Sequence, residues 1–242
     1  EEIDHFCRPE SGAICYAWLN SESKPMQLAE AGYQVVIATA SHLYFDFAYC
    51  NHHEEKGLSW GGYTDEYRSF DWEPAQHENI IGMSAQLWSE VIRTFSQVEW
   101  QLYPKIFGLA ERSWNAAYNA NGTLLDYNHR SKLSLGDYNH LVYNVHLPRL
   151  AANGHNFHIQ QPGIRQVATE NEQLQLDKSH ILIEMNKVMQ GGEILYCLDD
   201  GEWKVYTNTI AIPATTQIVK AKVRYLGKES NTTWLWVNDE KE

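Results

Sequence analysis

The feature that most constrains the fold is an alternation of short apolar runs with helix-like segments over residues 1 to about 155. The run Gln34–Thr39 is β-branched and apolar on both faces, which is typical of a buried parallel strand. Ala13–Trp18 and Ile80–Gln86 are similar apolar runs and predict two further strands. Because helix-like segments separate these runs, the sequence favours an α/β fold with a parallel sheet.

Three segments carry helix patterns. Pro25–Ala31 has a proline in its first turn and a glycine just beyond its end. Ser96–Trp114 repeats apolar residues every three or four positions, and we expect Pro104 to kink it. Asp137–Asn153 is a third helical pattern, and a glycine follows it as well.

The number of strand–helix units limits the architecture. About three units are present, whereas a closed TIM barrel contains about eight, and three alone would leave free sheet edges and uncovered apolar faces. We therefore expect residues 1–160 to be the C-terminal portion of a (β/α)8 TIM barrel, an incomplete barrel whose other strands lie upstream of Glu1. The chain has no signal peptide and does not begin with Met, so we interpret it as part of a longer polypeptide.

The pattern changes after Pro162-Gly163. Short alternating runs follow, separated by turns, and Asp199-Asp200-Gly201 is a strong hairpin signal. We expect residues 161–242 to form a small antiparallel, Ig-like β-sandwich domain. The predicted strands are His180–Met185, Glu193–Leu198, Thr216–Val223 and Thr232–Val237.

Composition excludes several classes of function. The formal net charge of -12 argues against nucleic acid binding, which needs a concentrated basic surface. No run approaches the length of a membrane-spanning helix, so we expect no membrane insertion. The four cysteines show no metal-ligand spacing, and neither a metal nor a cofactor is expected. Buried thiols are one interpretation, and a single disulfide among Cys7, Cys15 and Cys50 is the other.

Two aromatic–acid pairs mark a candidate sugar site, because aromatic rings stack on sugar faces and carboxylates accept from hydroxyls. Tyr44 and Asp46 follow the Gln34–Thr39 strand, and Trp88 and Glu90 lie two residues apart at the end of the next one. If the strand persists there, Trp88 and Glu90 share one face. The alternative is a packed Tyr with a turn carboxylate, and a core Trp with a helix N-terminal Glu.

Two further tryptophans are candidates for the same pocket. Trp18 ends the first strand and could wall the pocket, although a single Trp at such a position is more often part of a core. Trp60 lies in the glycine-flanked loop Gly57–Gly62, where we expect it to be exposed and available for stacking.

With these motifs the chain resembles the family-20 glycoside hydrolases, the β-N-acetylhexosaminidases, and in particular their bacterial chitobiase branch. Residues 12–115 resemble the C-terminal part of the catalytic barrel, residues 136–155 its closing helix, and residues 164–238 the small β-sandwich that follows in chitobiases. The matching motifs are Gly32–Val36, Leu43–Asp46, Gly57–Trp60, Gly82–Glu90 and Tyr103–Trp114.

The resemblance implies a glycosidase of chitin degradation. Such enzymes remove terminal non-reducing N-acetylhexosamine from chitobiose and chitooligosaccharides with retained configuration, and the acetamido carbonyl of the substrate is the nucleophile. In the same terms Tyr44 would hold the acetamido oxygen, Asp46 would bind the 6-hydroxyl, and Glu90 would bind the 4- and 6-hydroxyls. The compartment is not evident from the residues, and the resemblance suggests the periplasm or cell envelope.

The remaining roles implied by the resemblance are aromatic, and one part of the family's site is missing. Trp18 and Trp88 would wall the acetamido pocket, and Trp60 would stack on the next sugar. The family's catalytic Asp-Glu pair precedes these motifs, and residues 1–43 contain no equivalent. We therefore predict that this chain alone is inactive, with the N-terminal part of the barrel and an N-acetylglucosamine-containing oligosaccharide as partners. The alternative is a non-catalytic carbohydrate-binding or interaction module.

Overall fold

The computed structural model describes residues 8–19, 21–114, 133–167 and 179–237. The chain divides into two compact units. The first contains residues 1–138 and 153–157, and the second contains residues 139–152 and 158–242. The helical residues 139–152 thus group with the second unit, and the domain boundary near residue 160 stays a prediction.

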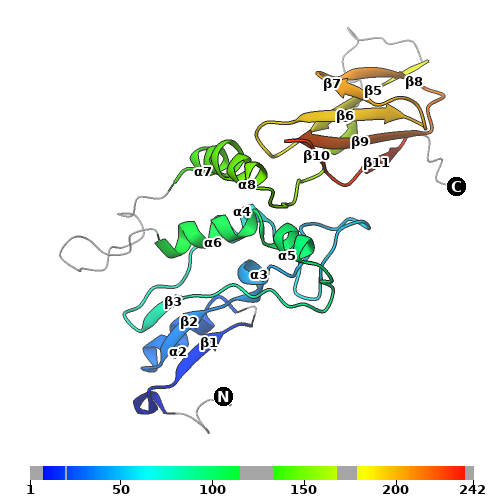
Figure 1. Ribbon diagram of the computed structural model, residues 1–242. Coiled ribbons are helices and arrows are strands. Elements are labelled where there is room, and N and C mark those ends of the chain that lie inside the picture. Colours follow the sequence, from blue (N-terminus) through cyan, green and yellow to red (C-terminus); the bar gives the residue numbers. More distant parts are fainter. Residues whose placement is uncertain (1–7, 20, 115–132, 168–178, 238–242) are drawn as a thin grey trace, which may run out of the picture. The chain divides into compact units, whose positions relative to one another are not determined.

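A three-stranded parallel sheet organises the first unit, in the order β1-β2-β3 (Figure 1). Its strands are β1 (Ile14–Ala17), β2 (Gln34–Ile37) and β3 (Ile80–Met83), and both pairings are parallel. All three strands expected from the apolar runs are therefore present, and they pair as a parallel sheet.

Helices connect and follow the strands of this sheet. α2 packs against both β1 and β2, as a helix that crosses between neighbouring parallel strands does. Within the described ranges, no helix combines the length and apolar character needed to cross a bilayer. The helical elements are η1 (Pro9–Ser11), α2 (Lys24–Glu30), α3 (Ala40–Leu43), α4 (Glu66–Phe70), α5 (Phe95–Leu102) and α6 (Lys105–Trp114), and α7 (Leu135–Leu141) runs from this unit into the second.

The segment Ser96–Trp114 is two helices, so the prediction of one kinked helix was wrong. α5 and α6 are separated at Pro104. Proline lacks a backbone N–H and its ring collides with the preceding helical turn, so it ends the first helix here. The start of α5 is fixed by a capping box in which the Thr94 side chain accepts from the Gln97 backbone N–H, and the Gln97 side chain accepts from the Thr94 backbone N–H.

The third strand is shorter than the predicted Ile80–Gln86. β3 ends at Met83, because its neighbour β2 ends at Ile37 and the chain then turns into α3, so no continuous partner strand remains. Beyond β3 the chain pairs again in an isolated parallel bridge between Tyr44 and Gln86. Trp88 therefore does not lie on a regular strand, contrary to the geometry assumed for its pairing with Glu90.

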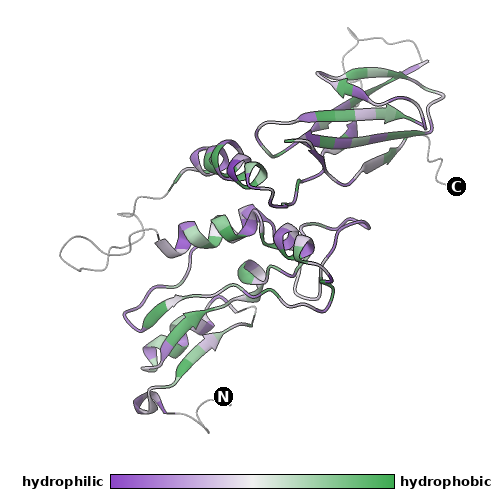
Figure 2. Cartoon of the chain, in the orientation of Figure 1, coloured by the Kyte–Doolittle hydropathy of each residue, from purple (hydrophilic) through white to green (hydrophobic). Residues whose placement is uncertain are grey.

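The two faces of the parallel sheet differ. Cys15 and Val35 belong to a buried cluster with residues of α2 on one face. Ile14 and Tyr16 of β1 point to the opposite face, where their side chains are 48% and 57% exposed. Figure 2 shows these strands as mainly hydrophobic. Parallel sheets are normally covered on both faces, and within the described residues only one face is covered.

The second unit contains two antiparallel sheets (Figure 1). In the larger sheet, β9 pairs with β6 along one side and with β10 and β11 along the other, and β7 pairs with β6. In the smaller sheet β5 lies between β4 and β8. The strands are β4 (Gly163–Gln166), β5 (His180–Asn186), β6 (Glu193–Leu198), β7 (Lys204–Tyr206), β8 (Ile210–Pro213), β9 (Ile218–Tyr225), β10 (Lys228–Glu229) and β11 (Thr233–Trp236).

The four strands predicted in this region are present as β5, β6, β9 and β11, with ends that differ by up to two residues. The predicted hairpin connects β6 and β7. Its first turn residue, Asp199, has a φ of 51°, and its carboxylate accepts from the backbone N–H groups of Gln217 and Ile218. The sequence analysis missed β4, β7, β8 and β10, which are at most four residues long and too short for a clear alternating pattern.

The helical segment predicted at Asp137–Asn153 begins two residues earlier, in α7, and ends in α8 (Leu147–Ala152). A π-helical turn, η3 (Val142–His146), lies between them. Inside the second unit the Tyr225 hydroxyl donates to the Tyr143 carbonyl. This bond ties the π-helical turn to β9.

Candidate functional site

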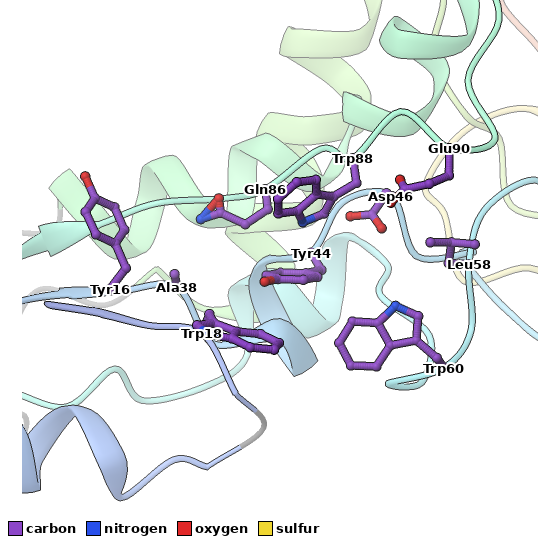
Figure 3. A pocket seen from close by; sticks show the side chains of 10 residues that line it. All are labelled: Tyr16, Trp18, Ala38, Tyr44, Asp46, Leu58, Trp60, Gln86, Trp88 and Glu90. Atoms are coloured by element: carbon purple, nitrogen blue, oxygen red, sulfur yellow. The ribbon is translucent and has the colours of Figure 1, made fainter. Parts of the chain in front are cut away.

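A cavity of about 570 Å³ lies at the carboxyl end of the parallel sheet (Figure 3). The carboxyl ends of parallel strands meet at one edge of a sheet, so residues distant in sequence converge there. All six residues predicted from the aromatic–acid pattern line this one cavity, while their roles remain predictions. The lining consists of Tyr16, Trp18, Ala38, Tyr44, Asp46, Leu58, Trp60, Gln86, Trp88 and Glu90.

Backbone pairing brings the two aromatic–acid segments together. The Phe45 N–H donates to the Gln86 carbonyl at 2.7 Å, and the Gln86 N–H donates to the Leu43 carbonyl at 2.8 Å. The segment after β2 and the segment after β3 are therefore held side by side without a regular strand. This pairing places Tyr44 and Trp88 on the same cavity.

The loop carrying Trp60 is held by a close backbone approach. The Leu58 N–H donates to the Asp46 carbonyl and the Ala48 N–H donates to the Leu58 carbonyl, both at 2.9 Å. Gly57 has a φ of 130°, and a Cβ there would lie 2.6 Å from the Asp46 carbonyl oxygen. Only glycine suits that conformation and that space, and Trp60 consequently reaches the cavity with 60% of its surface exposed.

The aromatic residues surround Tyr44. The Trp18 ring is stacked with the Tyr44 ring at a centroid distance of 6.4 Å and an angle of 14°. Trp60 meets Tyr44 edge-on at 5.9 Å. Trp18 and Trp88 are 47% and 53% exposed, so the prediction that Trp18 could belong to a core is not what the structure shows. Exposed indole faces beside a cavity are available to a ligand.

The hydroxyl of Tyr44 is a neutral group at physiological pH. Burial raises the pKa of Tyr44 above its usual value, the Asp46 carboxylate raises it further, and a side-chain hydrogen bond from Trp88 partly offsets both. A phenol with a raised pKa keeps its proton and can donate a hydrogen bond to a ligand.

Asp46 is fully buried, yet neither carboxylate oxygen has a hydrogen-bond partner of good geometry among the described residues. Burial is the main cause of its raised pKa, and the nearby Glu90 carboxylate raises it further, whereas the backbone N–H groups of Asp46 and Trp88 and the charge of Lys105 lower it. Figure 3 shows the Asp46 and Glu90 carboxylates close together at the cavity. A buried carboxylate is costly when no donor reaches it in good geometry, so Asp46 is suited to a ligand that brings hydroxyl donors.

Lys105, which the sequence analysis missed, holds the backbone around Asp46 in place. Its Nζ is completely buried and donates to the carbonyls of Phe45 at 2.9 Å and Phe47 at 2.6 Å, and to Gln101 Oε1 at 3.1 Å. The two carbonyls flank Asp46. Burial lowers the pKa of Lys105 to about 7, against the opposing effect of nearby acidic groups. A lysine just after a proline at a helix start carries no sequence signal for such a role.

Four lining residues were also not predicted. Tyr16 precedes Trp18 by two residues on the exposed side of β1, a spacing that could have indicated its position. Gln86 lines the cavity as part of the bridge with the chain near Tyr44. Within the described ranges, no group of three or more His, Cys, Asp or Glu side chains is placed to hold a metal ion.

Comparison with known proteins identifies the class of the first unit. Residues 1–117 match glycosyl hydrolase family 20, catalytic domain. The solved GH20 beta-N-acetylhexosaminidase of Streptomyces coelicolor is similar with a TM-score of 0.51 and 26% identity over 62% of this chain and 30% of that chain. A GH20 exo-beta-N-acetylglucosaminidase of Vibrio harveyi, solved with N-acetylglucosamine, is similar with a TM-score of 0.50 and 25% identity. This match covers 60% of this chain and 22% of that chain. These likenesses show a TIM-barrel-related fold.

The curated relatives agree with this class. The N,N'-diacetylchitobiase of Vibrio harveyi is 24% identical over 86% of this chain and 26% of its own length. Beta-hexosaminidase B of Pseudoalteromonas piscicida is 31% identical over 38% of this chain and 15% of its own length. The comparisons thus agree that the first 117 residues of the chain are similar to the catalytic domain of glycosyl hydrolase family 20. The chain spans about a quarter of the chitobiase and less of the hexosaminidase.

Proposed function

We propose that the first unit forms the substrate-binding wall of a β-N-acetylhexosaminidase that hydrolyses terminal non-reducing N-acetylhexosamine of chitobiose and chitooligosaccharides. The observation that carries this proposal is the buried Asp46 carboxylate, which has no hydrogen-bond partner of good geometry among the described residues, in a cavity lined by exposed indoles. A sugar supplies both the hydrogen-bond donors that the carboxylate lacks and the flat apolar faces on which indoles stack. Its hydroxyls donate to the carboxylate and its C–H faces stack on the rings.

Orientation of the sugar follows from the positions of the polar groups. Asp46 accepts from the 6-hydroxyl, and Glu90 accepts from the 4- and 6-hydroxyls at the same side of the cavity. Trp18 and Trp88 enclose the acetamido group, and Trp60, on its exposed loop, stacks on the next sugar. The two neighbouring carboxylates mark one end of the cavity and so give a pyranose ring a preferred orientation.

Tyr44 orients the nucleophile of the reaction. In substrate-assisted hydrolysis the acetamido carbonyl oxygen of the substrate attacks the anomeric carbon with retention of configuration. The neutral Tyr44 hydroxyl donates to that oxygen, holds it in line for attack, and stabilises the charge that shifts during the step. The contribution of this wall is positioning and electrostatics.

The architecture of the whole enzyme is part of the same proposal. We infer that the parallel unit is part of a TIM barrel, since Ile14 and Tyr16 lie exposed on a sheet face that parallel sheets normally cover. The antiparallel sheets of the second unit form the β-sandwich of chitobiases. The 242-residue chain contains no Asp-Glu pair placed after a strand and before Tyr44, so it binds substrate and does not cleave it alone.

Binding tests the proposed site directly. N-acetylglucosamine should perturb the tryptophan fluorescence of the full chain, and Trp88→Ala should weaken its affinity about tenfold or more, as loss of a ring contact does. Trp114→Ala is the matched control, because Trp114 is 87% exposed and lies outside this cavity. Equal effects of the two substitutions, or no response to the sugar, would refute the assignment.

A turnover assay tests whether the chain binds substrate without cleaving it. The chain alone should release no chromophore from a chromogenic chitobioside above the rate of the Tyr44→Phe variant. Clear turnover that Tyr44→Phe removes would show that the general acid lies within these 242 residues.

A further inference from the structure

The larger sheet of the second unit carries three exposed tryptophans that the proposed site does not use. Trp203 is 40% exposed, Trp234 is 44% exposed and Trp236 is 61% exposed. Several exposed large aromatic side chains on one face of a domain generally mark a binding site. We refer to the three residues as the tryptophan face.

Strand register places the three rings on one side of the sheet. Lys220 of β9 lies opposite Cys197 of β6 on one side and Trp234 of β11 on the other. Leu195 lies opposite Val205, so the same register continued by two residues sets Trp203 opposite Cys197. Residues directly across from each other share a face.

Two contacts support this assignment. The Lys222 ammonium lies 4.3 Å from the centre of the Trp203 ring, so β9 and the residue before β7 meet on this side. The opposite side of the sheet is turned toward the smaller sheet, because the Met185 N–H of β5 donates to the Tyr206 hydroxyl of β7. Trp236 follows Trp234 by two residues and lies on the same side as it.

The spacing of the rings suits an extended ligand. Trp203 and Trp234 are separated by three strand-to-strand steps, which is about 14 Å. Trp236 lies about 7 Å along the strand from Trp234. A single sugar ring cannot contact both ends of such a surface, whereas an oligosaccharide can.

The charges on this face are neutralised within the sheet. Lys220 pairs with Asp200 at 2.7 Å, Lys222 with Glu229 at 2.5 Å, and Arg224 with Glu193 at 2.9 Å. An anionic ligand would have to compete with these carboxylates, and the chain's net charge of -12 opposes its approach. The complementary partner is therefore uncharged and carries both flat apolar faces and polar edges.

We propose that the tryptophan face is a second carbohydrate-binding surface, which takes an extended, neutral oligosaccharide of β-linked N-acetylhexosamine. The identity of the sugar rests on the proposed function of the first unit, and the surface itself rests on the register, exposure and charge pairing of the second. Stacking on separated indoles holds several sugar units at once. The surface thus retains a polymeric substrate, and the cavity near Tyr44 takes a terminal sugar.

The test uses nitrogen-15 indole NMR of the full chain, with signals assigned by Trp203→Phe, Trp234→Phe and Trp236→Phe. Chitohexaose should shift these three indole N–H signals, both in the wild-type chain and in Trp88→Ala. Monomeric N-acetylglucosamine should shift only the indoles of the cavity. In the Trp88→Ala background, further loss of Trp234 and Trp236 to Ala should weaken chitohexaose binding about tenfold or more. Unchanged amide spectra of β6 and β9 verify folding of the variant.

The outcomes separate this inference from the proposed function. Three unmoved signals at millimolar chitohexaose would overturn the inference, whatever the cavity does. Shifts with chitohexaose but no cavity response to N-acetylglucosamine would support the inference and contradict the proposed function. Equal shifts with cellohexaose would overturn the N-acetylhexosamine assignment. Shifts that depend on protein concentration without sugar would show that a second copy of the chain covers this face, and would also overturn the proposal.

Discussion

The buried ammonium of Lys105 gives the sharpest physical prediction, which concerns the pH dependence of stability. In the folded chain its pKa is about 7, against an ordinary value of 10.5. Between these values the unfolded chain binds more protons than the folded chain, so the free energy of unfolding rises with pH. The lysine contributes an increase of about 2 kcal/mol between pH 7 and pH 9.

The substitution Lys105→Met removes the titrating group and keeps a long apolar side chain. The difference in unfolding free energy between wild type and Lys105→Met should therefore grow by about 2 kcal/mol in favour of the wild type from pH 7 to pH 9. Lys56→Met is the matched control, because Lys56 is an exposed lysine whose ammonium lies 5.8 Å from the centre of the Trp100 ring. Its difference from wild type should stay constant over this range.

The assay is urea unfolding followed by hydrogen exchange and mass spectrometry of peptides from the first unit, which separates its unfolding from that of the second. Met cannot donate to the carbonyls of Phe45 and Phe47, so the peptide containing these residues should also lose protection. A difference that does not change with pH would refute the lowered pKa. A difference that shrinks would show that nearby carboxylates outweigh burial.

Three further predictions concern the site and its support. The raised pKa of Asp46 means that its ionised form costs stability, and more so as pH rises through that pKa. At pH 7, Asp46→Asn should therefore unfold at a urea concentration at least as high as that of the wild type. In a fluorescence titration it should bind N-acetylglucosamine about tenfold more weakly. Reduced stability with unchanged binding would contradict this prediction. The raised pKa of Tyr44 keeps its hydroxyl protonated, so it remains a hydrogen-bond donor between pH 7 and pH 9. The ratio of wild-type to Tyr44→Phe affinity for N-acetylglucosamine should therefore stay constant over this range. Gly108→Ala should destabilise the first unit by about 2 kcal/mol, because a Cβ at residue 108 would lie 2.2 Å from Ser69 Oγ. Gly136→Ala is the control and should be neutral or slightly stabilising, because the nearest atom to its added Cβ lies at 3.7 Å. Equal shifts of the two variants in thermal unfolding would contradict this packing.

Much of the first unit could be predicted because its signals are local. The three apolar runs that became β1, β2 and β3 show their strand character in four consecutive residues each. The break at Pro104 was visible as an interruption, although one residue cannot show whether a helix bends or ends. The capping box at Thr94 was present in the sequence and overlooked.

The candidate site could be predicted in its members but not in its geometry. Tyr44, Asp46, Trp88 and Glu90 were selected as two pairs after neighbouring strands, which places them at one sheet edge by topology alone. The assumption that a strand carries Trp88 and Glu90 on one face was wrong, since β3 ends before them. The paired backbone around Gln86 brings them to the cavity instead.

The sequence by itself determined which residues are apolar, aromatic and acidic, and through their spacing it determined seven of the strands in the described residues, most of the helices and the six candidate site residues. Tertiary structure alone decided that Asp46 is buried without a well-aligned donor among the described residues, that Lys105 donates to the carbonyls on both sides of it, and that the tryptophan face lies on one side of a sheet. The physical reason is that periodicity reports the surroundings of each short segment. Burial, pKa and shared faces depend on contacts between segments far apart in the chain, which no local pattern encodes.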